Sequence, residues 1–243
     1  MVSIKAMAEC IGLEMSEEIS IVKDFFGYTQ APEPLSLKTQ VSRLQNLRKH
    51  FHINCILVGT PDHPRNASQQ QQVERQQQEI DIAVHTLRDI YANYDVGVGR
   101  VRQYEITDGN ANGRSIIDDN DEAKALTEEW TFPGDALDVF FVQSYVGEVC
   151  GYSPYIGTCD KNFGRFTGCV IELSSGRGGG VGSYTPQETT GLVLAHEIGH
   201  YFGLAERLHN PNNLMYQELT SGTELDDAQT WRIKTHCFMR SSC

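Results

Sequence analysis

The chain has 243 residues, of which 40% are hydrophobic and 9% aromatic, so it can bury a sizeable core in one large domain. Its formal net charge of −12 argues against binding to nucleic acid or to anionic membrane surfaces, and favours a soluble monomer whose copies repel one another. The sequence has no run of about 18 apolar residues, which argues against a membrane-spanning helix.

The N-terminal third contains an extension, a strand and a long helix. Residues 1–47 are mixed in character and partly helical in pattern, and we expect a pro-segment or a helical cap. The β-branched apolar run at 51–59 predicts a buried strand. The segment 68–94 predicts the clearest helix, because its apolar residues repeat at helical spacing. This stripe consists of Val73, Ile80, Val84, Leu87, Tyr91 and Tyr94.

The middle of the chain alternates strands with a shorter helix. We expect strands at 96–106, 136–146 and 168–175, and a helix at 121–130. This order predicts an α+β fold in which a mixed, mostly parallel, twisted sheet packs on helices, with the short strand 168–175 at an edge. The segment 108–121 is rich in Asp, Asn and Gly. Its composition suits a Ca²⁺ site, but it lacks EF-hand spacing, and a solvated loop is the alternative.

The seven cysteines leave two interpretations open. They are either buried thiols in a reducing compartment, or two or three disulfides plus one free thiol in a secreted protein. Cys150 and Cys159 flank a Gly- and Tyr-rich loop, which favours disulfide bonds. We therefore expect a secreted protein, although the start of the chain lacks the pattern of a signal peptide.

The segment 185–203, TPQETTGLVLAHEIGHYFG, carries the strongest signals in the chain. Thr185 is a candidate N-cap, Pro186 suits the first helical position, and Glu188 completes a capping box. Gly203 suits the left-handed residue that ends a helix. We expect one helix between these two signals.

Within this helix His196 and His200 lie one turn apart on the same face, so both imidazoles can bind one metal ion. Zinc suits them, since catalytic zinc sites combine three protein ligands with a water molecule. Zinc also lowers the pKa of that water toward about 7. Glu197, beside the first ligand, is placed to accept the proton and pass it to the leaving amine.

The stretch HEIGHYFGLAE…NNLMYQ resembles the metzincin clan of zinc endopeptidases, and within it the matrixin-like members. The resemblance covers about residues 48–236, and it is specific only from His196 to Tyr216. It implies a zincin catalytic domain over 48–243, with an active-site helix, a Met-turn and a C-terminal helix, which would be capped at Thr223. It also implies that Met215 is the Met-turn residue, an apolar floor beneath the zinc.

The third zinc ligand departs from the family pattern. The family's histidine position holds Glu206, and a histidine follows three residues later at His209. A carboxylate can bind zinc, and the distance to Met215 favours Glu206. His209 is the usual residue type, and a Glu from the following segment, Glu218 or Glu224, is a third alternative. All three remain open from the sequence.

The family also places the substrate antiparallel to the edge strand before the motif. That implies substrate binding along the segment formed by Val170, Ile171, Glu172 and Leu173.

The leading hypothesis is a zinc-dependent endopeptidase in which Glu197 acts as general base and acid. Its partners would be protein or peptide substrates. One alternative is an inactive zinc-binding homologue that binds a partner, although the intact Glu197 argues against it. Another is a highly specific, toxin-like effector that shares the mechanism and differs in its target.

Overall fold

The computed structural model describes residues 49–62, 66–132, 134–147, 150–161, 166–174 and 179–241. The expectations for the extension at 1–47, together with Cys10 and Cys243, lie outside these residues. No helix of the described part is long and apolar enough to cross a bilayer.

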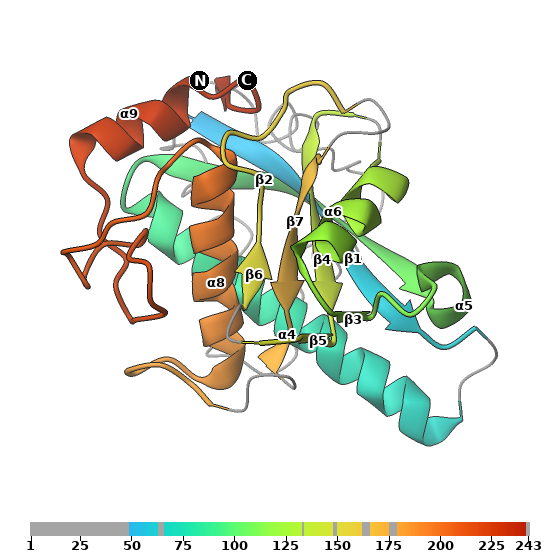
Figure 1. The fold of residues 1–243 in the computed structure, drawn as a ribbon. Coiled ribbons are helices and arrows are strands. Elements are labelled where there is room, and N and C mark those ends of the chain that lie inside the picture. Colours follow the sequence, from blue (N-terminus) through green and yellow to red (C-terminus); the bar gives the residue numbers. More distant parts are fainter. Residues whose placement is uncertain are drawn as a thin grey trace, which may run out of the picture.

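The main sheet is mixed and mostly parallel, as the sequence predicts (Figure 1). Its strands lie in the order β2-β1-β4-β7-β6, with β8 paired to the start of β1. Neighbours from β2 to β7 run parallel, whereas β6 and β8 run antiparallel to their partners. The strands are β1 (Lys49–Thr60), β2 (Val96–Thr107), β4 (Ala136–Val142), β6 (Gly151–Tyr152), β7 (Gly168–Glu172) and β8 (Arg240–Ser241).

The expectation that the short strand at 168–175 forms the sheet edge is wrong. β7 lies inside the sheet, because Tyr152 and Gly151 of β6 pair with Val170 and Ile171. Two residues are too few to leave a strand pattern in the sequence, so β6 was missed. The side chains of the predicted substrate-binding segment are all buried. They are Val170, Ile171, Glu172 and Leu173. The substrate role given to them stays a prediction.

Helices cover both faces of this sheet. On one face α4 (Ala67–Ala92) and α8 (Pro186–Tyr201) pack on Phe51, Leu137 and Ile171 in the larger core. On the other face α6 (Asn120–Glu129) packs on Phe140 and Val170 in a smaller core. The alternation of side chains along β1, β4 and β7 explains the two cores, since successive residues point to opposite faces.

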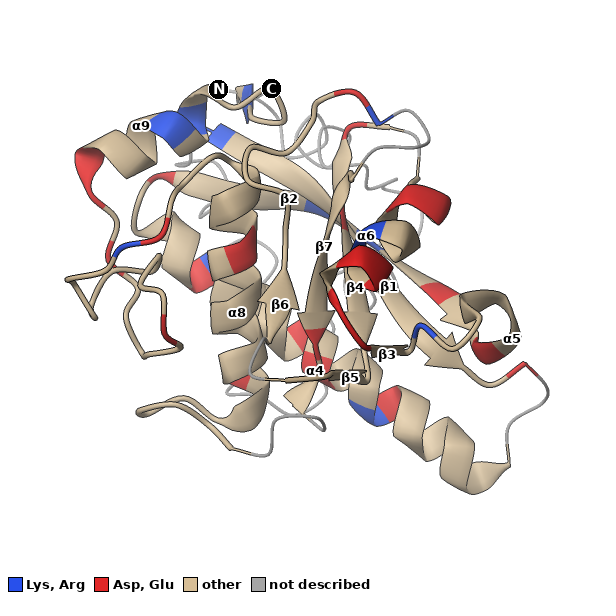
Figure 2. Cartoon of the chain, in the orientation of Figure 1, with Lys and Arg blue, Asp and Glu red and all other residues tan. Residues whose placement is uncertain are grey.

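The remaining elements are short. Helix α5 (Asp108–Ala111) follows β2, and β3 (Ile116–Ile117) pairs with β5 (Ser144–Tyr145) in a second, two-stranded sheet. Helix α9 (Asp227–Thr235) is the last helix. Its first turn is acidic and its last turn carries Arg232 and Lys234 (Figure 2), a charge order that complements the helix dipole.

The motif helix α8 is anchored to α4 by close packing and buried hydrogen bonds. A Cβ atom at Gly191 would lie 2.5 Å from Cβ of Thr86, so the two helices approach closely there. The Tyr91 hydroxyl donates to the Ala195 carbonyl at 3.0 Å. The buried Glu79 carboxylate accepts a hydrogen bond from the Thr190 hydroxyl at 2.7 Å. These contacts fix the helix on which His196 and His200 lie.

A buried ion pair ties the loop before β7 to the middle of the sheet. Lys161 Nζ lies 2.7 Å from the fully buried carboxylate of Asp138 in β4. The same carboxylate accepts from the Asn54 amide at 2.7 Å and from the Phe132 amide N–H at 2.9 Å. Since a buried charge is costly unless it is paired and hydrogen-bonded, these contacts hold the loop at one place on β4.

Candidate metal centre

The signals at both ends of α8 are confirmed. Thr185 is the N-cap, its side chain accepts from the Glu188 amide, and Glu188 returns a hydrogen bond to the cap N–H. At the other end Gly203 has φ +89°, and its N–H donates to the His200 carbonyl at 2.8 Å. The Leu204 N–H donates to the Gly199 carbonyl at 2.9 Å, which completes a Schellman motif and turns the chain back toward the histidines.

Three side chains from this region converge on one point. Glu206 Oε1 lies 3.2 Å from His200 Nε2 and 3.5 Å from His196 Nε2. The imidazole rings are 4.7 Å apart and nearly perpendicular. One ligand atom from each of the three side chains lies within 4.8 Å of the others. The turn made by Gly203 is what brings Glu206 back to the helix.

Backbone carbonyls fix the orientation of both histidines. His196 Nδ1 lies 2.8 Å from the Leu214 carbonyl oxygen, and His200 Nδ1 lies 2.8 Å from that of Leu204. A carbonyl can only accept, so each Nδ1 carries a proton, and Nε2 is the nitrogen whose lone pair is available to a metal when the imidazole is neutral. This arrangement is typical of metal-binding histidines, whose second nitrogen is held by a neighbouring acceptor.

When both imidazoles are neutral, the three converging atoms present lone pairs to one another, and they repel unless a proton or a metal cation lies between them. A proton between Glu206 and one imidazole would relieve the repulsion between those two side chains only. Metal–ligand bonds of about 2.0–2.2 Å at tetrahedral angles place ligand atoms about 3.4 Å apart. The observed 3.2 and 3.5 Å separations bracket this value. The donor set thus fits a zinc ion.

The charges and hydrogen bonds of these three side chains shift one another's pKa values. Burial lowers the pKa of His196, but the hydrogen bond to Glu206 and the Glu197 charge outweigh it, and the pKa is raised overall. Burial and the neighbouring His196 lower the pKa of His200. Burial raises the pKa of Glu206, but its contacts with the two histidines outweigh this and the pKa is lowered. The site therefore holds Glu206 ionised.

Glu197 occupies a different environment from Glu206. It is only 8% exposed, and burial raises its pKa to about 7, with His196 opposing this shift and Glu206 adding to it. A Cβ atom at Gly151 in β6 would lie 2.8 Å from Cγ of Glu197, so the edge strand runs directly beside this side chain. A carboxyl with a pKa near neutrality suits a group that takes up and releases a proton at pH 7.

Met215 lies beneath the two histidines. It is fully buried, and its sulfur would be 2.5 Å from a Cβ atom at Gly199, which lies between His196 and His200 in α8. Its amide N–H donates to the Asn213 side chain at 3.0 Å, and its carbonyl accepts from the Arg207 N–H at 2.6 Å. The role of Met215 as an apolar floor beneath a metal ion stays a prediction.

The other candidates for third ligand lie apart from this cluster. Among the described residues, neither His209 nor Glu218 nor Glu224 belongs to a group of three converging metal-binding side chains, and all three are exposed. The geometry favours Glu206, and the identity of the third ligand stays a proposal. The Ca²⁺ site at 108–121 also stays a prediction, because none of the residue groups that could hold a metal in the described part includes that segment.

Several contributors to the site were missed from the sequence. The final helix begins at Asp227 with Asp226 as its cap, and the expectation of a cap at Thr223 is wrong. Gln229 completes this capping box and also exchanges two hydrogen bonds with Asn213, at 2.9 and 3.0 Å. The last helix thereby holds the turn that carries Met215 and the Leu214 carbonyl. The spacing of Asp226 and Gln229 was a readable signal for the helix start.

Comparisons with known proteins give a distant structural likeness and no sequence match. Neither the known protein families nor the curated proteins contain a match to this sequence. Among solved structures, the chain is similar to the archaemetzincin of Methanopyrus kandleri, with a TM-score of 0.44 and 14% identity. The similarity covers 76% of this chain and 95% of that one. The matrixin-like features inferred from the motif stay predictions.

Proposed function

We propose that this protein is a zinc-dependent endopeptidase. The observation that carries the proposal is the convergence of His196 Nε2, His200 Nε2 and Glu206 Oε1, while both Nδ1 atoms are already held by backbone carbonyls. The adjacent, buried Glu197 supplies the acid–base group that such a centre needs. The metzincin-like motif and the place of Met215 support the same interpretation.

In this proposal His196, His200 and Glu206 hold the metal. A zinc ion bound there supplies Lewis acidity, which polarises the carbonyl of the scissile bond and acidifies water. Glu197 takes the proton from the attacking water and delivers it to the nitrogen of the leaving amine. Its raised pKa, about 7, allows both transfers near neutral pH. The Leu214 and Leu204 carbonyls keep the imidazoles in one tautomer throughout.

The substrate segment is proposed to pair with β6 in place of β7. Among the described strands, β6 is the last in the sheet on that side, and its Gly151 lies against Glu197. An extended peptide added to this edge would pass beside the acid–base group, and its main chain would be held by backbone hydrogen bonds.

Cleavage of an unfolded protein substrate tests the proposal. The wild-type protein is expected to cut it, a chelator to stop the cleavage, and added zinc to restore it. Glu197→Gln, which keeps every proposed ligand, should retain zinc but lose activity by at least about 100-fold. Glu74→Gln, a change at an exposed carboxylate of α4, is the matched control and should leave activity unchanged.

If wild type and Glu197→Gln cut equally, or neither cuts any substrate in a broad peptide library, the enzyme proposal fails. Zinc retention without cleavage would instead support the partner-binding homologue. Secretion is likewise a proposal, and the disulfide between Cys159 and Cys237 supports it, because such bonds persist mainly in oxidising compartments.

A further inference from the structure

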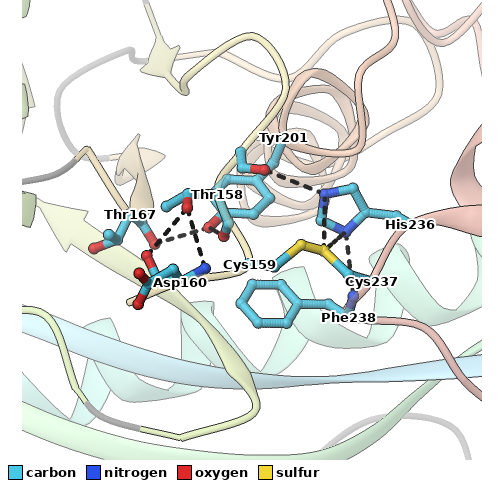
Figure 3. The surroundings of a disulfide bond; sticks show 9 residues. Thr158, Cys159, Asp160, Thr167, Tyr201, His236, Cys237 and Phe238 are labelled. Atoms are coloured by element: carbon cyan, nitrogen blue, oxygen red, sulfur yellow. Dashed lines mark hydrogen bonds between the residues drawn. A yellow bond between two sulfur atoms is a disulfide. The ribbon is translucent and has the colours of Figure 1, made fainter. Parts of the chain in front are cut away.

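A second cluster of metal-binding side chains lies away from His196 and His200. It consists of Cys159, His236 and Cys237, whose ligand atoms lie within 4.8 Å of one another (Figure 3). The two cysteines form a disulfide across 78 residues of sequence, with their Cα atoms 6.0 Å apart. Both cysteines are exposed and the histidine is half-buried. The cluster is therefore accessible to solutes while one ligand is held by packing.

The cluster joins the loop before β7 to the segment that follows α9. The loop itself is bound to the C-terminal end of α8. The Ile156 and Gly157 N–H groups donate to the His200 and Tyr201 carbonyls, at 3.1 and 2.7 Å. The Tyr201 hydroxyl donates to the Thr158 carbonyl at 2.8 Å. These contacts hold the loop in place next to Cys159 independently of the disulfide, so the sulfur stays near His236 when the S–S bond is opened.

We propose that Cys159, His236 and Cys237 form a second metal site, which takes Zn²⁺ once a dithiol reductant has opened the disulfide. The reductant supplies two electrons and two protons, and is itself oxidised to a disulfide. Cys159 and Cys237 become thiols, and each loses its proton to solvent as its sulfur binds the ion. The S–S bond and the bound ion are thus alternative cross-links between the same two segments. This site is independent of the proposed peptidase centre.

The histidine geometry suits this role. The Gly157 carbonyl oxygen lies 3.4 Å from His236 Nε2 and can only accept, so Nε2 carries the proton. The Nδ1 lone pair accepts from the Phe238 N–H at 3.3 Å, a hydrogen bond that a bound metal ion would replace. His236 Nδ1 lies 3.8 Å from Cys237 Sγ. Tetrahedral zinc, with bonds of about 2.0–2.1 Å to nitrogen and 2.3 Å to sulfur, places such atoms about 3.6 Å apart. Because Cys237 Sγ lies 3.8 Å from Nδ1 and 4.0 Å from Nε2, the imidazole or the cysteine side chain must also rotate to bring a shared ion onto the Nδ1 lone pair.

The sulfurs must separate, but only by a small amount. Two thiolates on one tetrahedral zinc lie about 3.8 Å apart, compared with about 2.0 Å in a disulfide. The required change of about 1.8 Å is within reach of side-chain rotation, because both cysteines are at the surface. Two thiolates and one imidazole, with water as the fourth ligand, match the donor set of an open zinc site that has three protein ligands.

Cobalt(II) titration of the full chain tests the proposal, since a thiolate ligand gives a sulfur-to-cobalt charge-transfer band that nitrogen and oxygen ligands do not. The reduced protein is expected to bind one cobalt ion with this band, and the oxidised protein to show none. The band should persist in the His196→Ala/His200→Ala double variant, which separates this site from the peptidase centre. Zinc should displace the cobalt and remove the band.

Variants distinguish the site from binding by scattered thiols. Cys159→Ser/Cys237→Ser should abolish the band, and His236→Ala, which keeps every thiol, should weaken cobalt binding at least tenfold. Circular dichroism of the reduced protein and of the double cysteine variant reports on folding. A band that is unchanged in the cysteine variant overturns the proposal. So does reduced protein that shows no band, whether it remains folded or unfolds.

Discussion

Gly199 lies directly against Met215, so that a Cβ atom at position 199 would come within 2.5 Å of the methionine sulfur and 3.2 Å of its terminal methyl. This contact connects the helix that carries both histidines to the turn that carries the Leu214 carbonyl. The helix and the turn therefore have little freedom to move relative to each other.

Gly199→Ala is expected to displace Met215 and the turn around it. Overpacking of a dense core costs roughly 1–3 kcal/mol of unfolding free energy, and zinc affinity should fall as well because the His196 imidazole is held by the same turn. Urea unfolding and zinc titration measure the two effects. The control is Gly179→Ala, where an added Cβ meets nothing within 4 Å. Equal unfolding free energies and equal zinc affinities in the two variants would contradict the contact.

The choice between Glu206 and His209 can be decided by zinc affinity. Glu206→Ala should weaken zinc binding by at least about 100-fold, since even the loss of an outer-shell partner costs about 10–100-fold. His209→Ala should change it less than twofold, because this exposed residue lies outside the cluster. Competition with a chromophoric chelator gives both values. The reverse order of effects would assign His209 as the ligand.

The pair formed by Asn213 and Gln229 is expected to position the Met-turn. Gln229→Ala leaves the buried Asn213 amide without its partner, which costs about 1–3 kcal/mol of unfolding free energy. Zinc affinity should fall too, because Leu214 follows directly in the chain. Gln217→Ala, at an exposed side chain, serves as control. A loss of stability with unchanged zinc affinity would leave Gln229 with a purely structural role.

His52 is expected to destabilise the protein in acid. Burial lowers its pKa from 6.5 to about 4, with the Arg100 charge adding to this and Asp135 opposing it. Its Nδ1 accepts the Arg100 N–H at 3.0 Å, a hydrogen bond that requires the lone pair. Between these two pKa values the unfolded chain binds more protons than the folded one, so stability is complete above pH 6.5 and falls as the pH drops.

At pH 5 protonation of His52 in the unfolded chain lowers the free energy of unfolding by about 2 kcal/mol. His52→Asn keeps a hydrogen-bond acceptor but does not titrate. The variant should therefore lose about 2 kcal/mol less than wild type between pH 7 and pH 5 in urea unfolding. The difference between the two proteins isolates this residue from the other histidines. Equal losses of unfolding free energy in the two proteins would show that His52 does not contribute to the acid destabilisation.

The parts of the fold with strong local signals could be predicted from the sequence. The caps of α8 at Thr185 and Gly203 follow from side-chain chemistry within a few residues, and the structure confirms both. The apolar stripe of the long helix was also correct from Val73 to Tyr91, although the helix ends at Ala92. Such signals are local, and tertiary packing reinforces them here.

Features that depend on contacts between distant segments could not be predicted in the same way. The two-residue strand β6 exists only because β7 offers it a partner. The Leu214 carbonyl that orients His196 is 18 residues away, and a backbone acceptor leaves no mark on composition. The bond partner of Cys159 lies 78 residues along the chain. Sequence spacing likewise left Glu206, His209 and a Glu from the following segment as alternatives, whereas the path of the turn after Gly203 brings Glu206 beside the two histidines.

The most direct measurement of the central claim is anomalous diffraction at the zinc absorption edge from crystals of the protein grown with zinc. We predict one strong peak about 2.0–2.2 Å from His196 Nε2, His200 Nε2 and a carboxylate oxygen of Glu206, with Glu197 outside the coordination shell. The absence of a peak between these three side chains, or a peak coordinated by Glu197, would contradict the account.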